Sequence, residues 1–226
     1  MRGSKKGRPL TPVRTNLMKV VLDRFYPIID TGLLGKAGLD PLDLARALVW
    51  AGARLVQYRH KEPYTRQSYE QAGAIGRVVQ QGGARYIIND RADVALMLGA
   101  DGVHIGQQDL PPAAVREIAG GKLLVGLSTH NEAQLKAGER EPVDYLAIGP
   151  IFGTGSKENP DPIVGVEELS RLRAVAAKPL VAIGGITRER AGLVLEAGAD
   201  SLAVISDLAG EDLRDRAQQW VRLTRG

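Results

Sequence analysis

The sequence predicts an α/β protein that folds as one (β/α)8 TIM barrel. Eight short apolar runs recur along the chain, and longer segments with the helical spacing of apolar residues separate them. Short apolar strands that alternate with helices are typical of a parallel sheet covered by helices. Eight such units within 226 residues fit the length that a closed barrel needs.

The predicted strands are rich in Val, Ile, Leu and Ala, which suits strands buried on both faces. Seven of the eight carry a polar residue or glycine at or just after the end of the apolar run. In chain order the runs are "FYPIID" (25–30), "RLVQYRH" (54–60), "RYIIND" (85–90), "GVHIG" (102–106), "LLVGLS" (123–128), "DYLAIGP" (144–150), "PLVAIGG" (179–185) and "SLAVIS" (201–206).

Amphipathic segments rich in Ala and Leu lie between these runs. Asp40 before Pro41 is a helix start signal, and Gly198 is a stop signal. We expect Trp50 and Trp220 to pack their helix faces against the barrel. Clear examples of these helical segments are "PLDLARALVWAG" (41–52), "YTRQSYEQAGAIGRVVQQ" (64–81) and "TRERAGLVLEAG" (187–198).

A doubly wound open sheet is the alternative fold. It more often has five or six strands and a glycine-rich first turn. The turn after the first run, "DTGLLGKAG", lacks that fingerprint. We therefore expect a basic N-terminal tail over residues 1–24 and one barrel domain over residues 25–226, with no linker between domains.

The positive charge is concentrated in the tail. Residues 1–24 hold seven Lys and Arg against one Asp, a charge of +6, so the net charge of +4 leaves −2 for the remainder. The tail could contact nucleic acid or anionic lipid, but a solvated segment is the favoured interpretation. The chain has no cysteine, which excludes disulfides, thiolate catalysis and Cys-ligated zinc. We expect a cytoplasmic protein without a secretory signal or membrane span, compatible with a homodimer.

Polar residues stand at the carboxyl ends of the predicted strands, and in barrel enzymes this face carries the active site. Closing the barrel would bring these residues together. In strand order the residues at these ends, with the glycines and Ile205 included, are Gln57, Arg59 and Lys61; Asn89 and Asp90; His104, Gln107 and Asp109; Ser128 and His130; Thr154, Ser156 and Lys157; Gly184 and Gly185; and Ile205 and Ser206.

The charges at these ends indicate two anions and one metal. Three cations suit an anionic ligand, whereas Asp90 and Asp109 on adjacent strand loops are hard oxygen ligands. Carboxylates and phosphate oxygens share Mg²⁺ readily, so a diphosphate is the natural guess. Backbone N–H groups of "AIGGI" and "AVISD" could hold a second phosphate.

Each of these signals also fits a structural role. Asp90 and Asp109 each stand before a helical segment, where either could serve as the N-cap. The glycines at 184–185 could allow close packing of helix and sheet. His104 has no histidine partner at ligand spacing, which favours a hydrogen-bonded structural histidine over a metal ligand. The joint pattern, and not any single residue, favours a functional site over purely structural roles.

The chain resembles the thiamine phosphate synthase family. The motifs that carry the resemblance are "VQYRHK", "INDRADVALMLGADGVHIGQQDL", "VGLSTHNEAQ", "YLAIGPIFGTGSK", "AIGGIT" and "AVIS", within residues 25–207. The resemblance implies a (β/α)8 barrel that joins 4-amino-5-hydroxymethyl-2-methylpyrimidine diphosphate to 4-methyl-5-(2-phosphoethyl)thiazole with Mg²⁺. It implies thiamine phosphate and pyrophosphate as the products.

The resemblance also implies roles for particular residues. Asp90 and Asp109 match the Mg²⁺ ligands, and Lys157, Arg59 and Ser128 match the catalytic positions. The residues that match binders of the pyrimidine diphosphate are Gln57, Arg59, Lys61, Asn89, Ser128 and Lys157. The residues that match the thiazole-phosphate pocket are Thr154, Ser156, Gly185, Ile205 and Ser206.

Two positions depart from the family pattern. His60 stands where the family often has Glu, but neighbours on a strand face opposite ways, so we expect residue 60 to point away from Arg59 and Lys61. Ser156 stands where the family often has Thr, and its hydroxyl can still donate to a phosphate.

Two alternative functions stay open on the residues alone. A thiazole tautomerase on the same barrel would bind the thiazole phosphate and would need neither a diphosphate nor a metal. The presence of Asp90, Asp109 and Lys157 disfavours this alternative. A non-catalytic phosphate-ligand sensor would use the basic tail on nucleic acid, and its binding would weaken with salt.

Overall fold

The computed structural model describes residues 22–153 and 161–225 and contains one closed barrel of eight parallel strands. Each strand pairs with its neighbours in chain order, and β1 also pairs with β8 to close the barrel. The predicted (β/α)8 fold is therefore confirmed. The strands are β1 (Phe25–Asp30), β2 (Leu55–Arg59), β3 (Arg85–Asn89), β4 (Gly102–Ile105), β5 (Leu124–Thr129), β6 (Tyr145–Ile148), β7 (Leu180–Ile183) and β8 (Ser201–Val204).

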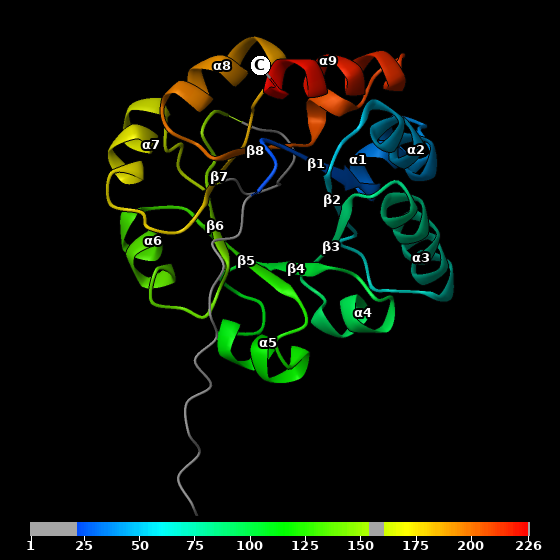
Figure 1. Cartoon of the computed structure of the whole chain (residues 1–226), viewed down its shortest axis with the longest axis horizontal. Helices are drawn as coiled ribbons and strands as arrows, with labels where there is room; N and C mark the ends of the chain where they lie inside the picture. The colour runs from blue at the N-terminus through cyan, green and yellow to red at the C-terminus, as the bar shows by residue number, and fades with distance from the viewer. Residues whose placement is uncertain (1–21, 154–160, 226) are drawn as a thin grey trace, which may run out of the picture.

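The helices form a ring outside the barrel, and Figure 1 shows α9 completing the ring beside α8 and α2. The three helical segments named from the sequence are present as α2, α3 and α8, each within two residues of the expected bounds. The helices are α1 (Thr31–Lys36), α2 (Pro41–Ala51), α3 (Arg66–Gln81), α4 (Ala92–Met97), α5 (Pro112–Ala119), α6 (Glu132–Gly138), α7 (Val166–Arg173), α8 (Arg188–Glu196), the 3-10 turn η1 (Ser206–Leu208) and α9 (Leu213–Arg225).

The strands divide the core into two layers, because successive side chains of a strand face opposite sides. The outward-facing set, such as Ile29, Val56 and Ile88, packs under the helices. The inward-facing set fills the barrel and includes Ile28, Leu55, Ile87, Tyr145, Ala147 and Val181. Residues that continue the inward set past a strand end therefore point into the mouth of the barrel, where the polar residues of the sequence lie.

The two tryptophans have different environments. Trp220 on α9 is fully buried and stacks on Phe25 of β1 with ring centroids 5.5 Å apart, as expected. Trp50 is 56% exposed, so the expectation that it faces the barrel is wrong. It lies two residues beyond the buried Leu48, which on a helix of 3.6 residues per turn is nearly the opposite face. There its ring lies under the guanidinium of Arg214.

The residues just before β1 are part of the barrel. Leu22 is buried among the inward-facing side chains. The Asp23 carbonyl accepts a 2.6 Å hydrogen bond from Ser201 Oγ, and the Arg24 carbonyl accepts one of 2.8 Å from the amide of Leu202. The bonds of Asp23 and Arg24 hold the chain against β8. In the described part of the chain, no helix has the length and apolar character to cross a membrane.

Candidate functional site

A cavity of about 670 Å³ opens at the carboxyl ends of the strands. Its volume lies in the range of small-molecule sites. Thr154, Ser156 and Lys157 lie outside the described residues. Every other site residue predicted from the sequence lines the cavity, namely Gln57, Arg59, Lys61, Asn89, Asp90, Asp109, Ser128, Gly185, Ile205 and Ser206.

The end of β2 directs Gln57, Arg59 and Lys61 into the cavity by strand alternation. His60 instead contacts the outer layer, where its Nδ1 lies 2.8 Å from Thr31 Oγ1 and its ring stacks on Tyr58. The expectation that residue 60 points away from its neighbours is confirmed.

Arg59 forms an ion pair with Asp30, the last residue of β1. The two residues are register partners across β1 and β2, so both continue the inward set at the same height. Asp30 also accepts a 2.9 Å hydrogen bond from the amide of Leu33 and so caps α1. The pair fixes the Arg59 guanidinium at the cavity wall.

Asp90 adopts a left-handed backbone conformation with φ of 64°, unlike any other non-glycine residue in the described ranges. Its amide donates to the carbonyl of His104 over 2.7 Å, and its carboxylate lies 2.6 Å from Lys61 Nζ. Burial raises the pKa of the Asp90 carboxyl above its ordinary value, and the neighbouring Asp109 adds to the rise while Lys61 opposes it. Two mutually repelling carboxylates therefore face one point of the cavity.

Neither carboxylate caps the helix that follows it, so the capping interpretation of Asp90 and Asp109 is wrong. The residue at the N-terminus of α4 is Arg91 and that of α5 is Pro111, and neither makes a side-chain capping bond. Asp109 instead accepts a 2.7 Å hydrogen bond from the amide of Gly106, which orients it toward the cavity.

The carboxylate pair also fits a hard cation. Mg²⁺ is commonly held by one or two carboxylates, with the remaining ligands from substrate phosphates and water. Within residues 22–153 and 161–225, no group of three His, Asp or Glu side chains has the arrangement to hold a metal alone. Asp90 and Asp109 would thus supply part of a ligand set that a substrate completes.

A chain of hydrogen bonds crosses the barrel at the base of the cavity, and four of its five residues line the cavity. Gln57 Nε2 donates to the Tyr26 hydroxyl over 2.8 Å, and that hydroxyl lies 2.8 Å from the Tyr145 hydroxyl. The Tyr145 hydroxyl lies 3.1 Å from His104 Nδ1, and His104 Nε2 lies 2.8 Å from Ser128 Oγ. We call these five residues the interior chain. It confirms His104 as a hydrogen-bonded histidine, and burial lowers its pKa to about 4.

The ends of β7 and β8 form the opposite wall. Gly184 and Gly185 have φ of 101° and 61°, and a Cβ on Gly184 would lie 2.6 Å from Pro150 Cα. Glycine is required here because the loop after β6 crosses directly over these residues, and the amide of Phe152 donates to the Gly184 carbonyl. Close packing and lining of the cavity are therefore both roles of these glycines.

Ser206 is held in place by its neighbour Asp207. The Asp207 carboxylate accepts hydrogen bonds of 2.9 Å from Arg188 on α8 and 2.8 Å from the Trp220 indole on α9. These bonds fix the turn after β8, where Ile205 and Ser206 line the cavity.

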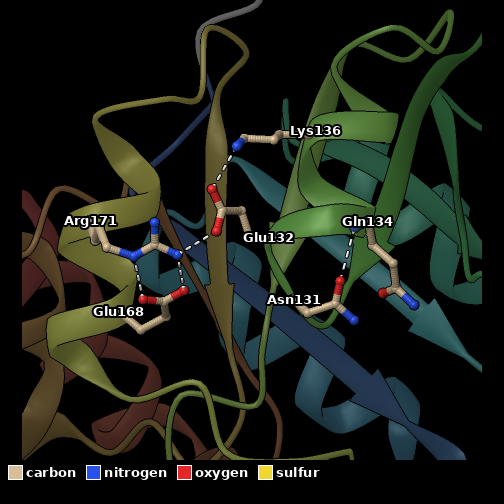
Figure 2. A network of polar contacts seen from close by, with 6 residues as sticks. All are labelled: Asn131, Glu132, Gln134, Lys136, Glu168 and Arg171. Carbon is tan, nitrogen blue, oxygen red and sulfur yellow. Dashed lines mark hydrogen bonds and ion pairs between the residues drawn. The ribbon is translucent and has the colours of Figure 1, made fainter.

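The start of α6 closes a third side. Asn131 caps the helix by accepting from the amide of Gln134, and Figure 2 shows this bond beside the ion-pair cluster of α6 and α7. In that cluster Arg171 lies 2.7 Å from Glu132, which also pairs with Lys136. Gln134 in turn accepts from the amide of His130, and both line the cavity.

Sequence reasoning overlooked three residues of the site. Asp30 ends the first run, which was the one predicted strand for which no polar end residue was named. Tyr26 and Tyr145 were not singled out, although each lies in the inward-facing set of its strand. The alternation of "FYPIID", which puts Tyr26, Ile28 and Asp30 on one face, was the signal that could have found two of them.

The charge of the cavity lining is slightly negative. Among the described lining residues, the cations Arg59 and Lys61 face the carboxylates of Asp90, Asp109 and Asp161, a net charge of −1. A polyphosphate bound against this lining needs further positive charge, since like charges at close range repel strongly.

Comparison with known proteins covers the whole barrel. The chain matches the thiamine monophosphate synthase family over residues 25–208. It is 46% identical over 204 residues to the thiamine-phosphate synthase of Koribacter versatilis, covering 89% of this chain and 96% of that protein. The enzyme of the same name from Laribacter hongkongensis is 44% identical over 191 residues, covering 84% and 89%. A solved structure of thiamine phosphate pyrophosphorylase from Pyrococcus furiosus aligns with a TM-score of 0.80 and 31% identity, covering 89% and 95%.

Proposed function

The chain belongs to the thiamine monophosphate synthase family, and we propose that its cavity holds the two substrates of thiamine phosphate synthesis side by side. The enzyme joins 4-amino-5-hydroxymethyl-2-methylpyrimidine diphosphate to 4-methyl-5-(2-phosphoethyl)thiazole and gives thiamine phosphate and pyrophosphate. Both substrates carry phosphate, so the cavity must bind two anions at opposite walls.

The diphosphate is assigned to the wall formed by β2 to β5. Arg59 and Lys61 offer charge-assisted donors there, and Ser128 offers a hydroxyl. Asn89 Nδ2 is buried and lacks a hydrogen-bond partner among the described residues, as suits a donor reserved for a ligand. Lys157, outside the described residues, is proposed to contribute a further cation to the same anion.

Mg²⁺ is proposed as the partner of Asp90 and Asp109. The net charge of −1 on the described lining would repel a diphosphate, and a divalent cation held by the two carboxylates would offset that repulsion. When bound, the ion would supply positive charge that offsets the charge developing on the leaving pyrophosphate. Asp90 and Asp109 would be the protein ligands that hold it.

The thiazole phosphate is assigned to the wall formed by β7 and β8. Gly185, Ile205 and Ser206 line this side, where the glycine backbone lets a phosphate approach closely. Thr154 and Ser156 are proposed to add hydroxyl donors from the loop after β6. This division keeps the two anions apart and brings the thiazole nitrogen toward the pyrimidine methylene.

The proposed reaction is a dissociative substitution. The bond between the pyrimidine methylene carbon and the diphosphate oxygen breaks, and its electron pair leaves with pyrophosphate. The aminopyrimidine ring delocalises the resulting cation, and the thiazole nitrogen donates its lone pair to form the new C–N bond. No proton is transferred in this step, so Lys157, Arg59 and Ser128 act by holding the leaving group and stabilising its charge.

The observation that carries this proposal is the convergence of Arg59, Lys61, Asp90 and Asp109 at one wall of the cavity. The test is to incubate the purified chain with each substrate alone and with both. Thiamine phosphate and pyrophosphate should form in equal amounts only with both. The Arg59→Ala variant should be severely impaired, whereas Arg46→Ala, an exposed arginine on α2, should match the parent. Conversion of a thiazole isomer without the diphosphate would instead support a tautomerase, and nucleic-acid binding without turnover would support a sensor.

A further inference from the structure

We infer that His104 is a positioning residue that, through the interior chain, fixes the Ser128 hydroxyl as a hydrogen-bond donor toward the substrate diphosphate. This inference rests on the proposed function for the identity of the anion. The direction of the interior chain itself is independent of that function and is tested separately.

The direction follows from counting hydrogens. Gln57 Nε2 can only donate, so the Tyr26 hydroxyl accepts from it and must use its single hydrogen elsewhere. The Tyr145 hydroxyl is 2.8 Å away and is the other partner recorded for Tyr26 in the described structure. Since a buried hydroxyl left without an acceptor is costly, Tyr26 donates to Tyr145.

The same logic continues to the cavity. Having accepted from Tyr26, Tyr145 donates to His104 Nδ1, which lies 3.1 Å away. An uncharged imidazole then carries its one hydrogen on Nε2 and donates it to Ser128 Oγ over 2.8 Å. The hydroxyl hydrogen of Ser128 therefore has no acceptor on the histidine. It is free to point into the cavity that Ser128 lines.

The fold provides space for this arrangement. Tyr145 is the register partner of Gly126 on β5, and a Cβ on Gly126 would lie 2.1 Å from Tyr145 Cζ. The missing side chain lets the Tyr145 ring lie across β5 and stack on His104, with ring centroids 5.5 Å apart. Glycine at 126 thus sets the Tyr145 hydroxyl against His104 Nδ1.

The chemical consequence is a donor that needs no reorientation when the anion arrives. A serine hydroxyl free to rotate could donate to the histidine and turn its oxygen lone pairs toward the diphosphate, which would repel it. A hydroxyl already aimed at the anion avoids that state, as preorganised donors do in other active sites. Tyr145 and His104 therefore affect diphosphate binding through the orientation of the Ser128 hydroxyl.

The first test reads the direction of the chain without any assay of activity. The full-length protein is labelled with 15N-histidine and its side-chain nitrogens are observed by NMR at neutral pH. The chain has three histidines, and the His104→Gln spectrum identifies the signals of His104. We expect Nε2 to carry the hydrogen and Nδ1 to be unprotonated. A hydrogen on Nδ1, or on both nitrogens, would overturn the inference even if the protein synthesises thiamine phosphate.

The second test reads the consequence for the substrates. Tyr145→Phe keeps the ring and removes the hydroxyl, and Tyr86→Phe is the matched control, because its buried hydroxyl bonds to Ala72 of α3 outside the cavity. We expect Tyr145→Phe to lower kcat/KM for the pyrimidine diphosphate about three- to tenfold. The KM for the thiazole phosphate should stay within about twofold of the parent, as should both parameters of the control. An unchanged Tyr145→Phe enzyme, or equal losses for both substrates, would contradict the inference.

A third comparison separates positioning from packing. Glutamine at 104 can present an amide N–H near the place of Nε2, whereas asparagine reaches only to the place of Nδ1. His104→Gln should therefore retain several times the kcat/KM of His104→Asn for the diphosphate, both measured at a temperature where each variant is folded. Equal losses in the two folded variants would show that His104 serves packing alone.

Discussion

Lys61 Nζ lies 2.6 Å from a carboxylate oxygen of Asp90, which has Asp109 as its other charged neighbour. The pair joins the end of β2 to the turn after β3 at the wall proposed for the diphosphate. A single ammonium balances one of the two carboxylates, so a second positive charge at this point is favourable. This relationship is the physical basis for expecting a divalent ion there.

Removing one carboxylate should therefore weaken the metal site. Asp90→Asn and Asp109→Asn should each lower turnover at least tenfold at low Mg²⁺, with partial recovery at high Mg²⁺, because the loss is one of metal affinity. The control is Asp93→Asn, an exposed carboxylate on α4 that pairs with Arg91. The check is a Mg²⁺ titration of the rate for each variant. Normal turnover at low Mg²⁺ would remove that aspartate from the ligand set.

Lys157→Ala should lower kcat more than it raises KM for the pyrimidine diphosphate, since its proposed contact with the leaving group would strengthen as the C–O bond breaks. A charge-assisted contact of this kind is worth roughly 2–4 kcal/mol, on the order of a hundredfold in rate. Lys157→Arg should restore part of the loss. Lys136→Ala, a lysine paired with Glu132 on α6, serves as control. A fewfold effect abolished by moderate salt would mean that Lys157 is only a solvated charge.

Deleting residues 1–20 should leave turnover and the free energy of unfolding nearly unchanged, because that segment lacks a periodic apolar face. The cut stops short of Leu22, which is buried inside the barrel. Leu22→Ala in the full chain should lower the free energy of unfolding by about 2–3 kcal/mol. Urea denaturation of both proteins provides the comparison, and a large loss of stability on deletion would show that residues 1–20 pack on the barrel.

His104 should make the stability of the protein depend on pH. Burial lowers its pKa from 6.5 to about 4, so between these values the unfolded chain binds a proton that the folded chain does not. The free energy of unfolding should therefore rise with pH across this window, by up to ~3 kcal/mol from this group, and level off above it. Urea denaturation at a series of pH values should show a shallower rise for His104→Gln. Parallel curves for the two proteins would mean that His104 titrates as it does in water.

The strand pattern predicted most of the site because alternation is a local property. Once "VQYRHK" is taken as the end of a barrel strand in which residue 57 faces inward, Gln57, Arg59 and Lys61 must point into the barrel and His60 must point out. The same argument places Asn89 and Ser128. Gly185 and Ser206 also follow from their position after a barrel strand.

Non-local pairings were beyond this reasoning. Asp30 meets Arg59 only because β1 and β2 pair in a register that aligns these two residues. The interior chain likewise depends on Tyr145 of β6 crossing Gly126 to reach His104 of β4. The helix-cap interpretation of Asp90 failed for a related reason, since its left-handed backbone and its bond to His104 turn the carboxylate away from α4.

The most direct test of the account is pyrophosphate release from both substrates, measured with Mg²⁺ and again after complete chelation. One wall of the cavity is proposed to hold a diphosphate jointly through cationic side chains and a metal on Asp90 and Asp109. We therefore expect rapid release with Mg²⁺, release lowered by at least a hundredfold on chelation, and full recovery when Mg²⁺ is restored. Equal rates of pyrophosphate release with and without the metal would contradict it.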